Sequence, residues 1–115
     1  MMTLETIAEK LSLKCKCCWE NLNREVTGGY AGDLLSDVMA NSEGGDIWVT
    51  RQVHQNIVAV AALKEHVGIV IVQGATPEQD TIDKAQKEGI PILISALPEF
   101  EVVGRLHRLL YPEQG

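Results

Sequence analysis

Along the chain, segments in which apolar residues recur at the period of a helix alternate with short apolar runs typical of strands. This pattern predicts alternating helices and strands. Over 4–11, apolar residues recur at the period of a helix, and Thr3 stands where it can cap that helix. The segment 12–23 has no clear period, and a short extended piece over 13–17 followed by a loop fits it best. The chain is therefore expected to begin with an amphipathic helix.

From residue 24 onward, short β-prone runs alternate with helical segments. The expected strands are 24–27, 47–50, 68–72 and 90–94. The expected helices are 34–40, 56–64, 76–88 and 98–110. Strands and helices that alternate with short connections form right-handed βαβ units and a parallel sheet covered by helices. We therefore expect an α/β fold, a three-layer domain with a small, mainly parallel sheet, and one such domain over 1–115.

Composition and charge narrow the classes of partner. Apolar residues make up 45% of the 115 residues and aromatic ones 4%, so the core must be aliphatic and stacking surfaces for single-stranded nucleic acid are scarce. Sixteen acids against ten bases give a net charge of −6, which repels phosphate backbones and anionic lipid. The longest apolar runs, 57–63 and 67–72, are too short to span a membrane. We expect neither a nucleic-acid partner nor a membrane partner.

Three cysteines, Cys15, Cys17 and Cys18, crowd into four positions. An odd, local cluster cannot form a disulfide framework, so reduced thiols and a cytoplasmic protein are expected. Structural zinc needs a second pair of ligands, whereas His66 and His107 are isolated in the sequence. We expect no metal site and no cofactor, and interpret the cysteines as small apolar filler.

A glycine-dense segment carries the strongest signal for a binding site. In open parallel sheets, ligands bind beyond the carboxyl ends of the strands. After the first expected strand this rule selects Thr27, Gly28, Gly29, Gly32 and Asp33. Glycine amides in such a loop, just before a helix, can hold an anion. The alternative interpretation is that Asp33 caps the helix 34–40 and the glycines only shape the turn.

The second expected strand is followed by a polar run that contains His54 and Asn56. The same rule selects Thr50, Arg51 and Gln52 in this run. His54 could hydrogen-bond a ligand, act as a general base or cap the next helix, or it could be a partly exposed loop histidine. No nucleophile stands beside it in the sequence, so a catalytic triad is not indicated.

Several separated motifs resemble the DRTGG domain family. They are Arg24-Glu25-Val26-Thr27-Gly28-Gly29-Tyr30, the run from Gly32 to Ala40, the run from Thr50 to Ala61, and Gly89-Ile90-Pro91. The resemblance implies a fold like the N-terminal domain of HPr kinase/phosphorylase, which is not itself the kinase. Domains of this kind accompany CBS pairs and phosphotransacetylase-type enzymes as regulatory units. The ligand-binding positions carried over are Thr27, Gly28, Gly29, Gly32, Asp33, His54 and Asn56.

Three functions follow from these observations. The first is a non-catalytic regulatory module that binds a small ligand, with an anion as the class suited to the glycine amides. The second is a protein-interaction module that forms a homodimer through its Leu-rich last helix and serves a kinase or a redox, hydrogenase-associated system. The third, a hydrolase or lyase acting through His54 and Asp33, lacks a nucleophile–base signature, so we expect no enzyme.

Overall fold

A five-stranded sheet lies at the centre of the α/β fold in the computed structural model, which describes residues 1–113. Its order is β1-β5-β4-β3-β2. The strands are β1 (Lys14–Cys15), β2 (Gly28–Ala31), β3 (Asp46–Thr50), β4 (Gly68–Ile71) and β5 (Ile92–Ile94). β2 to β5 run parallel, and β1 closes one edge antiparallel to β5. The mainly parallel sheet expected from the sequence is confirmed.

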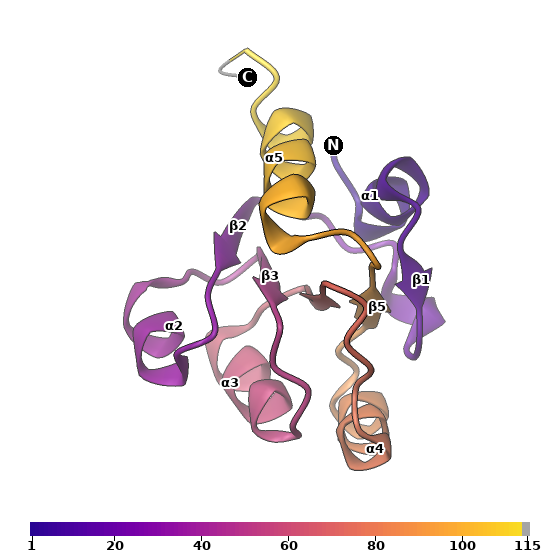
Figure 1. Ribbon diagram of the computed structural model, residues 1–115, viewed down its shortest axis with the longest axis vertical. Helices are drawn as coiled ribbons and strands as arrows, with labels where there is room; N and C mark the ends of the chain where they lie inside the picture. Colours follow the sequence, from indigo (N-terminus) through magenta and orange to yellow (C-terminus); the bar gives the residue numbers. More distant parts are fainter. Residues whose placement is uncertain (114–115) are drawn as a thin grey trace.

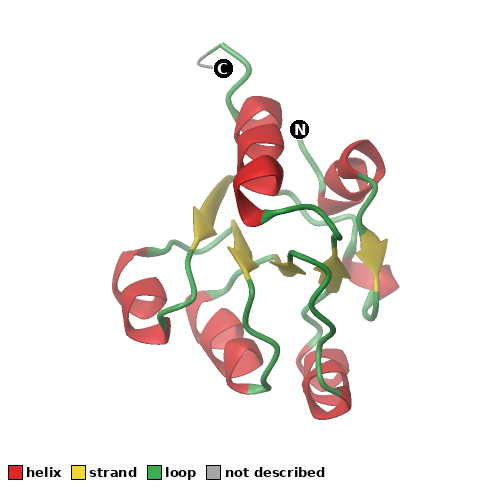
Figure 2. Ribbon diagram, in the orientation of Figure 1, coloured by secondary structure: helices red, strands yellow, loops and turns green. Residues whose placement is uncertain are grey.

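Helices cover both faces of this sheet, as Figures 1 and 2 show. They are α1 (Leu4–Leu11), α2 (Leu35–Asn41), α3 (Asn56–Lys64), α4 (Gln79–Glu88) and α5 (Glu99–Leu110), with a 3₁₀ turn over Trp19–Asn21. α1 and α5 pack on one face, and α2, α3 and α4 pack on the other (Figure 1). The three-layer arrangement is therefore present. Within residues 1–113, no helix is long and apolar enough to cross a membrane.

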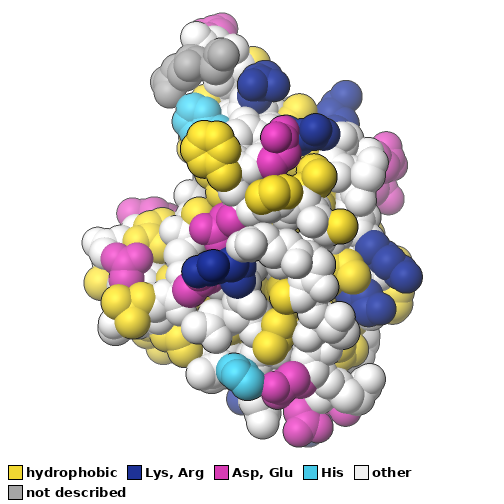
Figure 3. Space-filling view, viewed as in Figure 1, with side chains coloured by type: hydrophobic (Ala, Val, Ile, Leu, Met, Phe, Trp, Pro, Cys, Tyr) yellow, Lys and Arg dark blue, Asp and Glu magenta, His cyan; other side chains and the backbone are white. Residues whose placement is uncertain are grey.

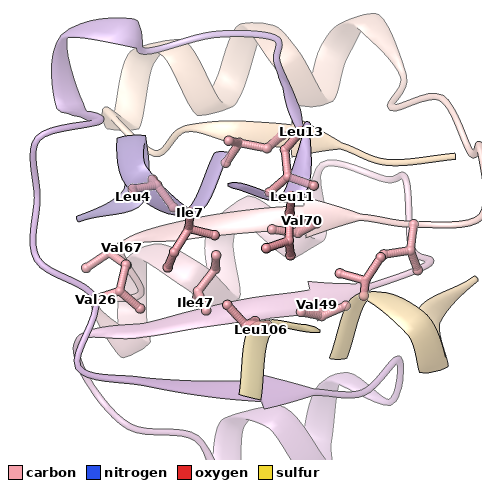
Figure 4. Close-up of a cluster of buried hydrophobic side chains, with 13 residues drawn as sticks. Leu4, Ile7, Leu11, Leu13, Val26, Ile47, Val49, Val67, Val70 and Leu106 are labelled. Atoms are coloured by element: carbon pink, nitrogen blue, oxygen red, sulfur yellow. The ribbon is translucent and has the colours of Figure 1, made fainter. Parts of the chain in front are cut away.

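The two faces of the sheet carry separate aliphatic cores. β3 and β4 are buried along their whole length, and successive side chains point to opposite faces. Ile47, Val49 and Val70 face α1 and α5, where Leu4 and Leu106 meet them (Figure 4). The residues that alternate with them in the strands belong to the second core, beneath α2, α3 and α4. The second core also holds Trp48, a fully buried aromatic residue, among its aliphatic side chains.

The expected strand 24–27 and its glycine turn are wrong. Residues 24–26 run back along the N-terminus, where the Val26 N–H donates to Met2 O at 2.8 Å. The sheet strand is Gly28–Ala31, paired in parallel with β3 from Asp46 onward. Gly28, Gly29 and Gly32 are not among the glycines with positive φ, so their conformational freedom is not used here. The β-prone residues 24–27 found a partner in the N-terminal segment, which a local pattern cannot anticipate.

Candidate functional site

Asp33 organises the polar groups at the carboxyl ends of β2 and β3. Its Oδ1 accepts hydrogen bonds from Thr50 Oγ1 and from the Arg51 backbone N–H, both at 2.8 Å. Its Oδ2 accepts from Arg51 Nε at 2.9 Å and Arg51 Nη2 at 2.7 Å. Both guanidinium bonds converge on the single oxygen Oδ2, while Oδ1 is held by Thr50 and the Arg51 backbone, so the two charged side chains are fixed relative to each other. Asp33 therefore holds the loop after β3 in one conformation.

Gln52 completes this arrangement. Its backbone N–H donates to Thr50 Oγ1 at 3.2 Å, and its Nε2 donates to the backbone oxygen of Asp33 at 3.0 Å. We call Asp33, Thr50, Arg51 and Gln52 the carboxyl-edge cluster. On the face seen in Figure 3, acidic and basic side chains meet below the first turn of α5. The cluster occupies the edge of the sheet at which ligands bind in open α/β folds.

The alternative interpretation of Asp33 as a helix cap is wrong. The N-cap position of α2 is Leu34, and it makes no side-chain cap hydrogen bond. The carboxylate of Asp33 is instead directed at Thr50 and Arg51 on the neighbouring chain segment. An acid does precede the helix, as the sequence indicates. Its carboxylate is nevertheless bound by Thr50 and Arg51, because a charged guanidinium is a stronger donor than the backbone amides at the start of the helix.

Glu99, in the first turn of α5, was not selected from the sequence. Its Oε1 is buried and has no hydrogen-bond partner among the described residues. Burial, and then the nearby charge of Asp33, raise the pKa of Glu99, although Arg51 acts in the opposite direction. Burial also acts to raise the pKa of Asp33, but its hydrogen bonds from Arg51 and Thr50 prevail and lower it. The pKa values of two neighbouring carboxyl groups are thus shifted in opposite directions, downward for Asp33 and upward for Glu99.

Arg51 is the group of the cluster that can bind a further molecule. A guanidinium has five N–H donors, and Asp33 engages only those on Nε and Nη2. The Arg51 side chain is 57% exposed. The remaining donors can therefore reach an anion or another acceptor without breaking the ion pair with Asp33.

The glycine segment does not lie at this edge as a unit. Thr27 and Gly28 are at the amino end of the sheet, where the Thr27 N–H donates to Gly45 O at 3.1 Å. Gly29 lies inside β2. Gly32 adjoins Asp33, and its N–H donates to Val49 O at 3.1 Å. Gly28 and Gly29 belong to a strand that pairs with β3. They therefore do not form the loop of backbone amides that was expected to hold an anion.

His54 lies in the connection from β3 to α3, and neither His54 nor Asn56 takes part in the hydrogen bonds of Asp33. The Nδ1 of His54 is 2.8 Å from Glu78 Oε2, and both side chains are at least half exposed. Asn56 is the first residue of α3. The His54–Glu78 pair joins the loops that precede α3 and α4, so the structure brings together Gly32 and Asp33 but pairs His54 elsewhere.

A buried polar pair at the amino end of the sheet also escaped the sequence analysis. Ser42 Oγ donates to Val38 O at 2.7 Å and lies 2.8 Å from His66 Nε2. Because the single hydroxyl proton goes to the carbonyl, His66 must donate from Nε2. Burial lowers the pKa of His66. A serine whose proton is directed away from the histidine is not a nucleophile–base pair, so this contact is structural.

The cysteines are packing groups. Cys17 and Cys18 are buried in the core beneath α4, and their thiols donate to the backbone oxygens of Ile90 and Ala85. Burial, followed by the charge of Cys17, raises the pKa of Cys18 to about 12. Among residues 1–113, no group of three or more His, Cys, Asp and Glu side chains could hold a metal ion.

Comparison with known proteins supports the fold. No family model and no curated protein sequence matches this chain. The crystal structure of the CBS and DRTGG domains of the regulatory region of Clostridium perfringens pyrophosphatase, complexed with its activator diadenosine tetraphosphate, is similar with a TM-score of 0.68 and 16% sequence identity. The match covers 90% of this chain and 45% of that chain, so this chain spans less than half the length of its structural neighbour. The likeness agrees with the expected DRTGG-like α/β fold.

Proposed function

We propose that this protein is a non-catalytic regulatory module that binds a small ligand at the carboxyl-edge cluster. The observation that carries the proposal is the use of Asp33. It accepts hydrogen bonds from Thr50 and Arg51 instead of capping α2, and so holds a charged loop rigid at the edge where open parallel sheets bind ligands. A polar cluster that the fold does not need for capping is consistent with binding.

The chemistry of the cluster favours a ligand with an anionic or hydrogen-bond-accepting group. The free N–H donors of Arg51 supply the attraction, and a phosphate or carboxylate can take two of them at once. The net charge of −6 does not oppose this, because contacts made at the site outweigh distant charges that salt screens. Arg51 thereby takes the role that the sequence assigned to the amides of Gly28 and Gly29.

The structural neighbour supports a regulatory role. It is a regulatory region, and its crystal structure contains an activator with four phosphates. A module with the same fold can act in the same general way, by changing stability or partner affinity when a small molecule binds. No nucleophile–base pair accompanies Arg51 among the hydrogen bonds of the cluster, which favours binding over catalysis.

The proposal is tested by thermal unfolding with AMP, ATP, diadenosine tetraphosphate and inorganic pyrophosphate as probes. A ligand at 100 times its dissociation constant stabilises the folded state by about 2.7 kcal/mol, which raises the melting temperature by several degrees. Amide chemical shifts in a ¹⁵N-labelled sample locate the contact. We expect at least one probe to raise the melting temperature and to shift residues 32–33 and 50–52.

Two arginine variants distinguish the site from general charge effects. Arg51→Gln should abolish the stabilisation by the active probe. Arg105→Gln removes another arginine that is about half exposed and whose ion pair is with Glu101 on the surface of α5, and it should leave the stabilisation unchanged. If none of the four probes raises the melting temperature, or if both variants respond alike, the carboxyl-edge site is wrong.

A further inference from the structure

β2 is a short edge strand, and its four residues include no charged side chain and no proline. Among residues 1–113, β2 pairs with β3 alone, so the other side of its backbone has no strand of the sheet beside it. Edge strands are normally blocked by lysine, proline or a bulge, or by a covering segment. The residues of β2 are Gly, Gly, Tyr and Ala, and its exposed positions are Gly29 and Ala31. Such a strand can accept another one alongside it.

An apolar groove follows this strand on the side of α5. Most of its lining is apolar, from Gly29, Ala31, Val49, Val103, Leu106 and Leu110, and Tyr30, His107 and Tyr111 complete it. The groove exists because the two β2 residues that face α5 have little or no side chain. Leu110 lies beside Gly29, where a Cβ would be 3.7 Å from its Cδ1, an ordinary van der Waals contact. We call this feature the α5 groove.

The size of the α5 groove decides what it can hold. Its volume is about 80 Å³. Pockets for drug-sized ligands begin at roughly 300 Å³. The groove has room for roughly two or three water molecules, each taking ~30 Å³ in the liquid, which is the scale of one aliphatic side chain. Its position beside an unpaired strand suits a side chain carried by a neighbouring strand.

On the opposite face of β2 lies the carboxylate of Asp37. Tyr30 packs on the α2 side of the sheet, and its hydroxyl donates to Asp37 Oδ2 at 2.5 Å. The surrounding segment, 23–46, carries five acidic residues and one arginine, Arg24. A strand that added to β2 would therefore place alternate side chains toward an apolar groove and toward the side on which Asp37 lies. Pairing of β2 with β2 of a second copy would bring two acidic segments together, which charge repulsion disfavours.

We propose that β2 and the α5 groove form a docking surface for an extended segment of another protein in which aliphatic and basic residues alternate. Main-chain hydrogen bonds to β2 would provide most of the affinity, and the groove would select one aliphatic side chain. The basic residues would face the α2 side, where Asp37 lies. This inference goes beyond ligand binding at the carboxyl-edge cluster and does not depend on it, because it uses other residues.

The test uses a synthetic peptide, acetyl-Lys-Val-Lys-Leu-Lys-Val-Lys-amide, titrated into the ¹⁵N-labelled protein. We expect amide shifts in 28–31 and in the last two turns of α5, and an affinity that falls as salt rises. A peptide of the same sequence with alternate backbone nitrogens methylated keeps the charge but cannot pair fully. It should bind at least tenfold more weakly. A peptide with Glu in place of Lys should not bind.

Two variants in which an alanine is replaced by leucine complete the experiment. Ala31→Leu fills the α5 groove and should weaken binding of the lysine peptide at least tenfold. Ala40→Leu adds the same side chain at an exposed position of α2 and should leave the affinity unchanged. Circular dichroism establishes that both variants fold. The proposal is overturned if the lysine peptide causes no shifts in β2, if the methylated peptide binds equally well, or if β2 instead mediates a homodimer that Ala31→Leu abolishes.

Discussion

Asp33 and Glu99 are neighbouring carboxyl groups whose surroundings shift their pKa values in opposite directions. Asp33 has four hydrogen bonds, and they lower its pKa despite partial burial. Burial and the nearby charge of Asp33 raise the pKa of Glu99, whose buried Oε1 has no hydrogen-bond partner within residues 1–113. The ionised form of Glu99 is therefore a local cost to the folded state, of the kind that binding sites retain.

Glu99→Gln is expected to stabilise the protein at pH 7 but not at pH 4. Because the pKa of Glu99 is raised above its unfolded value of 4.5, the folded state of the wild type binds more protons than the unfolded state just above pH 4.5. The stability that Glu99 contributes to the wild-type protein therefore falls as the pH rises through the pKa of Glu99 in the folded state. Melting temperatures of both proteins from pH 4 to pH 7 measure the difference.

Glu101→Gln is the matched control for that series. Glu101 lies on the same helix and pairs with Arg105 on the surface, where an ion pair contributes at most about 1 kcal/mol. This variant should be slightly less stable, or unchanged, at pH 7. A stabilisation equal to that of Glu99→Gln would mean that general relief of negative charge, and not the environment of Glu99, explains the result.

At the scale of elements, β2 depends on glycine for close approach. A Cβ on Gly28 would lie 2.7 Å from Asp46 Oδ1. Asp46 is itself buried, and its Oδ2 accepts the Glu43 N–H at 2.8 Å, so this short side chain has little freedom to move away. The sequence reveals the glycine but attributes it to a turn, because the contact with Asp46 depends on how β2 and β3 pair.

Gly28→Ala should lower the free energy of unfolding by about 1–3 kcal/mol, the usual cost of overpacking. Gly104→Ala is the matched control, because Gly104 lies within α5 and a Cβ there would meet nothing within 4 Å. It should raise the free energy of unfolding by about 1 kcal/mol through helix propensity. Urea denaturation measures both, and a Gly28→Ala protein as stable as wild type would show that β2 tolerates a side chain at this position.

At the scale of the whole molecule, two cores separated by the sheet protect the cysteines unequally. Cys15 is half-buried at the sheet edge, in β1, whereas Cys17 and Cys18 are enclosed between the sheet and α4. Thiols without a low pKa and without access to solvent react slowly. Access to the second and third thiols requires α4 to separate from the sheet.

We expect a thiol reagent such as dithionitrobenzoate to modify at most one cysteine in the folded protein and all three in denaturant. Cys15→Ser should leave no thiol that reacts quickly in the folded state. Under native conditions the slow reaction of the other two should follow the population of opened molecules. Rapid modification of all three in the folded protein would contradict the packing of residues 17 and 18.

The sequence by itself determined most of the helical and extended segments, with the first parallel strand as the exception, because those signals lie within a few residues of each other. The cap at Thr3, the apolar runs of β3 and β4, and the stop of α4 at Gly89 all follow from local patterns. The alternation of these elements also sufficed for a three-layer α/β fold with a mainly parallel sheet, since few arrangements bury such strands on both faces.

Only the tertiary structure decided how the polar residues are used. Asp33 bonds Thr50, which is 17 residues further along the chain, and Glu99 reaches the same region from the last helix. The strand that joins the sheet is 28–31 and not 24–27. Strand pairing depends on which other segments are available as partners, whereas β-propensity describes one segment alone. Register and long-range charge pairing are properties of two segments at once, and for that reason the site could be placed at an edge of the sheet but not assembled from the sequence.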